Sequence, residues 1–158
     1  IEDGQLLALH EGRVMPDWID YNGHMTEFRY GQVFSDATDA VIKAGGFDEA
    51  YLARGLSFYT VETHIRYLGE MSLGESFKTQ SQILSFDGKK LHLCHEMVNE
   101  AGTLAATGEH MLLHVDSQKG ASAPAIAPVA EGLGALAKAQ EGLAMPDYCG
   151  RSVGQKKS

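Results

Sequence analysis

Four strand-like segments follow one another without a long helix between them, and this order limits the folds open to the chain. They cover residues 57–68, 77–86, 90–98 and 104–115. Short turns separate them, and Asp87-Gly88 between the second and third is a typical hairpin turn. The segments therefore predict an antiparallel meander.

One long helical pattern precedes this meander. From residue 24 to residue 44, apolar and small residues recur at spacings of three and four, and Gly45-Gly46 ends the run. A lead-in strand is predicted for residues 5–15. We therefore predict an α+β fold in which an antiparallel sheet curls around one long central helix. Such a sheet leaves edges and apolar faces to cover, so we expect a dimer.

The first segment of the meander alternates between two faces. Glu62, His64 and Arg66 are predicted on its polar face, and Tyr59 and Val61 on its apolar face. If the sheet curls, the polar face lines a pocket at an interface, where Glu62 holds a cation or orients water. The alternative is a solvated strand face.

Composition bounds the class of protein. With 158 residues the chain fits one domain, which we place at residues 1–120; a linker, a short helix and a polar tail follow at 121–158. The net charge of −8 argues against a nucleic-acid partner. No apolar run reaches the ~20 residues that span a bilayer. The two cysteines, Cys94 and Cys149, form no close motif, so we expect a reduced, cytoplasmic protein.

The stretch Asp17-Trp18-Ile19-Asp20-Tyr21-Asn22-Gly23-His24-Met25 has the composition of an active site. Two carboxylates, an amide and a histidine lie just before the predicted helix. A helix start offers unpaired N–H groups and positive potential, which suit a developing oxyanion. A carboxylate beside it can act as nucleophile or general base.

Asp20-x-x-Gly23-His24 at the helix entrance, together with the order of elements, resembles the hotdog-fold acyl-CoA thioesterases of the 4-hydroxybenzoyl-CoA thioesterase branch. The resemblance covers residues 14–115. It places Asp20 at the catalytic aspartate position of that family, whereas Thr26 stands where Asn is common. It also implies an acyl-CoA substrate, homodimers or homotetramers with active sites at the subunit interface, and neither a cofactor nor a metal.

On this resemblance, Asp20 attacks the thioester or activates water, and the backbone N–H groups of Gly23 and His24 stabilise the oxyanion. The alternative for Asp20 is a helix cap. Asn22 either positions water or caps the helix, and His24 either orients Asp20 or is satisfied by local backbone. Asp17 fits the family position less well and is interpreted as a loop carboxylate.

The segment around Trp18 and the run Tyr59-Thr60-Val61-Glu62-Thr63-His64 are similar to thioesterases of carnitine breakdown that act on betainyl-CoA. Aromatic rings bind quaternary ammonium groups well. The aromatic residues near the predicted site are Trp18, Tyr21, Tyr30, Tyr59 and Tyr67. We predict substrate contacts from Trp18, Tyr21, Tyr59, Glu62 and His64; the alternative for each aromatic residue is ordinary core packing.

The phosphates of CoA need cations, and Arg54, Arg66, Lys89 and Lys90 are the candidates. A metal is not expected. His92 and His95 should face opposite ways on a strand, and His110 and His114 should lie ~13 Å apart.

Three functions are to be compared for a chain with these features. The first is a thioesterase for a small acyl-CoA, with betainyl-CoA favoured over an aromatic or medium-chain acyl-CoA. The second is a non-catalytic acyl-CoA-binding protein. The third, a hydratase, requires a glycine-rich signature that we do not find.

Overall fold

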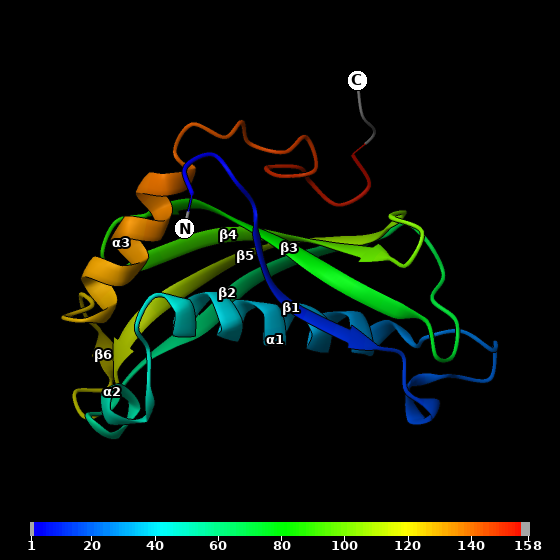
Figure 1. Cartoon of the computed structure of the whole chain (residues 1–158). Coiled ribbons are helices and arrows are strands. Elements are labelled where there is room, and N and C mark those ends of the chain that lie inside the picture. Colours follow the sequence, from blue (N-terminus) through cyan, green and yellow to red (C-terminus); the bar gives the residue numbers. More distant parts are fainter. Residues whose placement is uncertain (1, 156–158) are drawn as a thin grey trace.

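A curled antiparallel sheet lies against one long helix in the computed structural model, which describes residues 2–155 (Figure 1). The strands are β1 (Leu7–Arg13), β2 (Leu56–Tyr67), β3 (Ser76–Phe86), β4 (Lys90–Asn99), β5 (Leu104–Asp116) and β6 (Ala121–Ser122). The helices are α1 (Glu27–Ala44), α2 (Glu49–Ala53) and α3 (Val129–Gln140), with a 3-10 turn at Pro16–Trp18. The strand order is β1-β3-β4-β5-β2, with β6 on β5. The predicted α+β hotdog architecture is confirmed.

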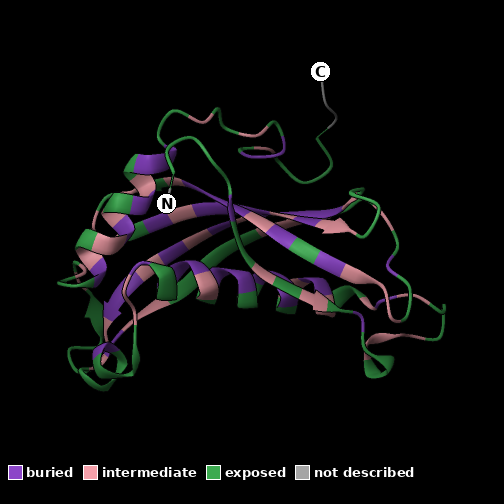
Figure 2. Ribbon diagram, in the orientation of Figure 1, coloured by how far each residue is buried: buried purple, intermediate pink, exposed green. Residues whose placement is uncertain are grey.

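Helix α1 is amphipathic and turns its apolar face to the sheet (Figure 2). Its buried residues recur at helical spacing and include Val33, Phe34, Ala37 and Val41. The helix begins at Glu27 rather than at the predicted residue 24, and Thr26, not Asn22, is its N-cap. Long-range backbone bonds hold the preceding residues in extended form: the Met25 N–H donates to the Met71 carbonyl.

A bulge in β2 changes the predicted strand faces. Thr60 pairs with Leu112 and Glu62 pairs with Met111, so Val61 is an extra residue. Since an extra residue inverts the alternation, Tyr59 shares the outer face with Glu62. The prediction that placed Tyr59 on the opposite face was therefore wrong.

Helix α3 packs into the same core as α1. Leu133 is fully buried in the cluster that also holds Val41 and Leu91. Gly132 of α3 lies against the backbone of Gly45 at the end of α1. The hydrophobic core thus extends beyond residue 120, where we expected the main domain to end.

Residues 141–155 cross the outer face of the sheet, in the orange-to-red part of Figure 1. Tyr148 and Cys149 pack against Cys94 of β4, and the Gly150 N–H donates to Glu109 at 2.8 Å. The predicted polar tail therefore contacts the sheet over its described part, and residues 156–158 lie outside the described residues. None of the helices in residues 2–155 is long and apolar enough to cross a membrane.

Candidate active site

The loop before α1 is a small closed hairpin. Ile19 and Met25 pair across it, and the Asp20 N–H donates to the His24 carbonyl at 3.1 Å. The Gly23 N–H returns to the Asp20 carbonyl at 3.0 Å. Gly23 has a φ of +82°, which residues with a side chain rarely adopt. These bonds hold residues 20–24 in one fixed turn.

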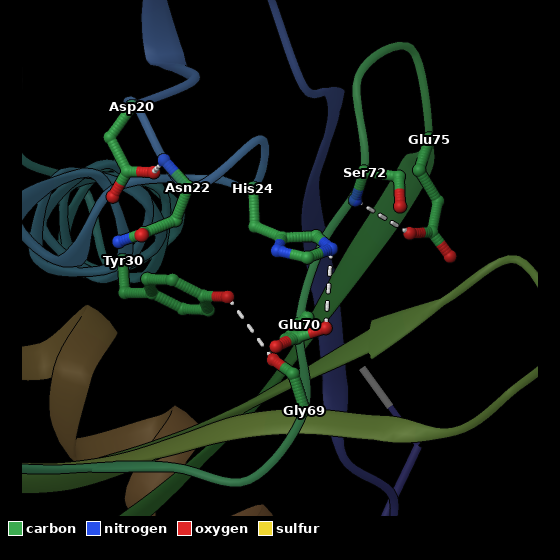
Figure 3. A network of polar contacts seen from close by, with 8 residues as sticks. All are labelled: Asp20, Asn22, His24, Tyr30, Gly69, Glu70, Ser72 and Glu75. Carbon is green, nitrogen blue, oxygen red and sulfur yellow. Dashed lines mark hydrogen bonds and ion pairs between the residues drawn. The ribbon is translucent and has the colours of Figure 1, made fainter.

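The Asp20 carboxylate has one bound oxygen and one free oxygen. Its Oδ1 accepts the Asn22 backbone N–H at 2.8 Å, in an Asx turn (Figure 3). No bond within residues 2–155 reaches Oδ2. The alternative role of Asp20 as a cap of α1 is excluded, because the helix begins seven residues later. The carboxylate therefore keeps one oxygen free to attack a carbonyl carbon or to take a proton from water.

The turn at residues 20–24 and the later start of α1 also change which N–H groups lie at the N-terminus of the helix. The Gly23 N–H is already bonded to Asp20, and His24 lies in the loop rather than in the first turn of α1. The first N–H groups of a helix have no intrahelical partner. Because α1 begins at Glu27, the N–H groups of Glu27 and Phe28 occupy that position. In this structure the Gly23 N–H would have to leave the Asp20 carbonyl before it could bind an oxyanion.

His24 is held by a carboxylate other than Asp20. Its Nε2 lies 3.2 Å from Oε2 of Glu70, which follows β2 (Figure 3). The side chain of Asn22 has no bond within residues 2–155, and Asn22 is exposed. Both residues stay candidates for catalysis, but neither orients the Asp20 carboxylate through its side chain in this chain.

A pocket of about 440 Å³ opens next to His24. It is lined by His24, Met25, Glu27, Tyr30, Tyr67, Leu68, Gly69 and Glu70. Burial raises the pKa of Tyr30, and its hydroxyl donates to the Gly69 carbonyl at 3.1 Å. Burial and the nearby Glu27 carboxylate also raise the pKa of Tyr67. Both phenols therefore stay neutral at ordinary pH.

Three of the five aromatic residues predicted to bind the quaternary ammonium, Trp18, Tyr21 and Tyr59, do not come together within one chain. Trp18 packs against Phe77, with ring centroids 6.2 Å apart, and Arg29 covers it at 5.5 Å. Tyr21 is 97% exposed. Tyr59 lies on β2 and points away from the helix, as the bulge requires.

Glu62 and His64 belong to a different pocket. They line a space of about 350 Å³ on the outer face with His92, Glu109 and Arg151. The residues that the sequence grouped as substrate contacts are therefore divided between the two sides of the sheet.

The four basic residues predicted to bind the CoA phosphates do not lie together within one chain. Lys90 pairs with Leu113, whereas Arg66 pairs with Thr107, which is ~20 Å away along β5. Lys89 adjoins Lys90, and Arg54 precedes the start of β2 at the same end of the sheet. Only Arg66 lies at the end of the sheet that carries the Asp20 loop, where it lines a pocket of about 650 Å³ with Arg151.

The histidines of β4 face opposite sides, as predicted. His92 Nε2 contacts Glu109 on the outer face at 2.7 Å. His95 lies beneath α1, where Thr38 and Ser81 each contact it at 2.7 Å. Burial lowers the pKa of His95 well below its usual value and that of His110 to about 4. Nothing in the sequence distinguished the two buried histidines, His95 and His110, from the histidines on the outer face.

Comparison with known proteins supports the same family. The model of the thioesterase-like superfamily matches residues 14–135. The chain is 38% identical over 152 residues to a betainyl-CoA thioesterase of Pseudomonas aeruginosa, covering 95% of this chain and 96% of that protein. It therefore belongs to the thioesterase-like superfamily.

Two further relatives extend the comparison. An L-carnitine dehydrogenase/betainyl-CoA thioesterase of Rhizobium meliloti is 48% identical over 152 residues, covering 96% of this chain. The chain spans 31% of the length of that relative. A Staphylococcus aureus protein solved in complex with CoA superimposes with a TM-score of 0.85 at 28% identity, covering 100% of this chain and 98% of that one.

Proposed function

We propose that this chain is an acyl-CoA thioesterase that hydrolyses betainyl-CoA to betaine and CoA. The observation that carries the proposal is the Asp20 carboxylate, whose Oδ2 is free and whose loop leads directly into the first turn of α1. The names of the relatives in Pseudomonas aeruginosa and Rhizobium meliloti support the acyl group.

In this mechanism the thioester carbonyl lies over the N-terminus of α1. The N–H groups of Glu27 and Phe28 stabilise the oxyanion as the C–O bond forms. Asp20 either attacks the carbonyl carbon directly or takes a proton from the attacking water. The C–S bond then breaks, and CoA leaves as a thiolate that is protonated. After direct attack, water hydrolyses the acyl anhydride on Asp20, which releases betaine and restores the carboxylate.

The proposed enzyme is a homodimer joined through β2. This strand lies at the end of the sheet order, and Tyr59 and Val61 on it are 54% and 58% exposed. Antiparallel pairing of two β2 strands places residue 56 of one copy near residue 67 of the other. Arg54 and the neighbouring lysines of one copy then lie near the Asp20 loop of the other, where CoA phosphates need cations. A tetramer built from two such dimers and a cytoplasmic location also belong to the proposal.

A thiol-release assay with betainyl-, acetyl-, hexanoyl- and 4-hydroxybenzoyl-CoA tests the proposal. We expect a preference for betainyl-CoA and a ~10²–10⁴-fold loss of kcat in Asp20→Asn. Asp17→Asn is the matched control, since Asp17 lies in the same segment but only contacts Arg29 at 3.4 Å. A full rate in Asp20→Asn would refute the catalytic role. Tight CoA binding without hydrolysis would instead indicate the non-catalytic binder.

A further inference from the structure

The pocket beside His24 combines two aromatic rings with two carboxylates from separate elements. Tyr30 of α1 and Tyr67 of β2 meet edge to face, with centroids 5.2 Å apart and planes at 86°. Glu27 comes from the first turn of α1 and Glu70 from the segment after β2. Tyr67 is 48% exposed, so part of its ring borders the pocket.

The described residues that line this pocket leave its negative charge without a lysine or arginine counter-charge. Neither Lys nor Arg is among the described residues that line it, and His24 contacts Glu70 but forms no ion pair with Glu27 within residues 2–155. The nearest arginine along α1 is turned elsewhere: Arg29 lies over the rings of Trp18 and Phe28 and 3.4 Å from Asp17. A cation would therefore enter a site of negative potential.

The two phenol donors of the pocket are already engaged, so what distinguishes the pocket is its aromatic surface beside two carboxylates. The Tyr30 hydroxyl is bonded to the Gly69 carbonyl, and the Tyr67 hydroxyl lies 3.5 Å from Glu27. The pocket then offers the exposed part of the Tyr67 ring and the negative charge of Glu27 and Glu70. A quaternary ammonium is attracted by both and requires no hydrogen bond.

We propose that Tyr67, Glu27 and Glu70 form the subsite that binds the trimethylammonium head of the acyl group, with Tyr30 supporting the Tyr67 ring. This inference rests on the proposed function. It keeps Tyr30 and Tyr67 from the predicted aromatic set and has Glu27 and Glu70 in place of Glu62 as the carboxylates. Glu27 links the two parts of the site. Its N–H lies at the proposed oxyanion position and its side chain lines the pocket. In betainyl-CoA, one methylene separates the carbonyl carbon from the charged nitrogen.

The test compares betainyl-CoA with 3,3-dimethylbutanoyl-CoA, in which a tert-butyl group of the same shape replaces trimethylammonium. We expect Glu70→Gln and Glu27→Gln each to lower kcat/KM for betainyl-CoA about fivefold, and Tyr67→Leu about tenfold. The neutral substrate should change less than about twofold in all three variants, because its binding involves no charge. Tyr67→Phe keeps the ring and should retain most of the discrimination. Glu131→Gln, on the exposed side of α3, is the matched control.

The outcomes separate this inference from the proposed function. Equal losses on both substrates in the three variants, or loss of discrimination in Glu62→Gln alone, would overturn the subsite while leaving the thioesterase intact. If the protein hydrolyses neither substrate, NMR titration with tetramethylammonium tests whether the subsite binds a quaternary ammonium. Binding that Glu70→Gln and Tyr67→Leu weaken supports the subsite, and binding that they leave unchanged, or no binding, overturns it.

Discussion

Replacing Gly132 with Ala should separate α3 from α1, because this glycine is where the two helices touch. A Cβ at Gly132 would lie 1.8 Å from the carbonyl oxygen and 2.5 Å from the carbonyl carbon of Gly45. Neither atom can rotate away, since both are backbone. Helix α3 would have to move outward by more than 1 Å, and the fully buried Leu133 beside it would lose its packing.

The magnitude follows from two opposing effects. Alanine is ~1 kcal/mol more favourable than glycine inside a helix. Overpacking costs ~1–3 kcal/mol, and more when backbone must move. We therefore expect Gly132→Ala to lower the free energy of unfolding by about 2 kcal/mol.

Gly134→Ala is the matched control in the same helix. A Cβ there meets no atom within 4 Å, so this variant should gain about 1 kcal/mol. Urea and thermal unfolding of both variants at one protein concentration measure the difference. We expect a lower Tm for Gly132→Ala, by about 2–4 °C per kcal/mol. Equal stability of the two variants would refute the close contact between α1 and α3.

Two further predictions concern the histidine layer and the free edge of the sheet. Because burial lowers the folded pKa of His110 to about 4, the unfolded chain binds more protons below pH ~6.5. The contribution of His110 to the free energy of unfolding should therefore be fully present above that pH. It should fall by up to ~1.4 kcal/mol per pH unit toward pH 4. His110→Asn should reduce this slope in urea titrations at pH 7 to 5; an unchanged slope would contradict the assignment. At the edge, Val61→Lys should convert the proposed dimer to monomer in analytical ultracentrifugation. Leu73→Lys, equally exposed at 58%, should leave it dimeric, and a dimeric Val61→Lys would exclude β2 as the interface.

The order and type of the elements could be predicted because their patterns are local. The spacing of apolar residues along α1 and the turn at Asp87-Gly88 each depend on a few neighbouring residues. The start of α1 was predicted three residues too early. Asn22 is a good helix cap in isolation, but a backbone bond from Met25 to Met71 keeps the chain extended up to Thr26. A contact over 46 residues leaves no mark on local spacing.

In the candidate site, too, local residues could be predicted from the sequence and contacts between distant residues could not. Asp20 could be proposed as the catalytic carboxylate from the sequence, because the loop residues that position it are its sequence neighbours. Glu70 could not, because its closeness to His24 depends on where β2 ends. Tyr59 and Tyr67 looked equivalent in the alternating pattern, and only the extra residue at Val61 places them on opposite faces.

The sequence by itself determined the α+β class and the order of the strands along the chain, and it was enough to propose Asp20, since each of these depends on a few neighbouring residues. The tertiary structure decided which side chains meet. It buried α3 beside α1, divided the predicted substrate contacts between the two faces of the sheet, and brought Glu27, Tyr67 and Glu70 around one pocket. The physical reason is that strand register and helix packing are set by contacts between distant segments, and a one-residue shift in register turns every following side chain to the other face.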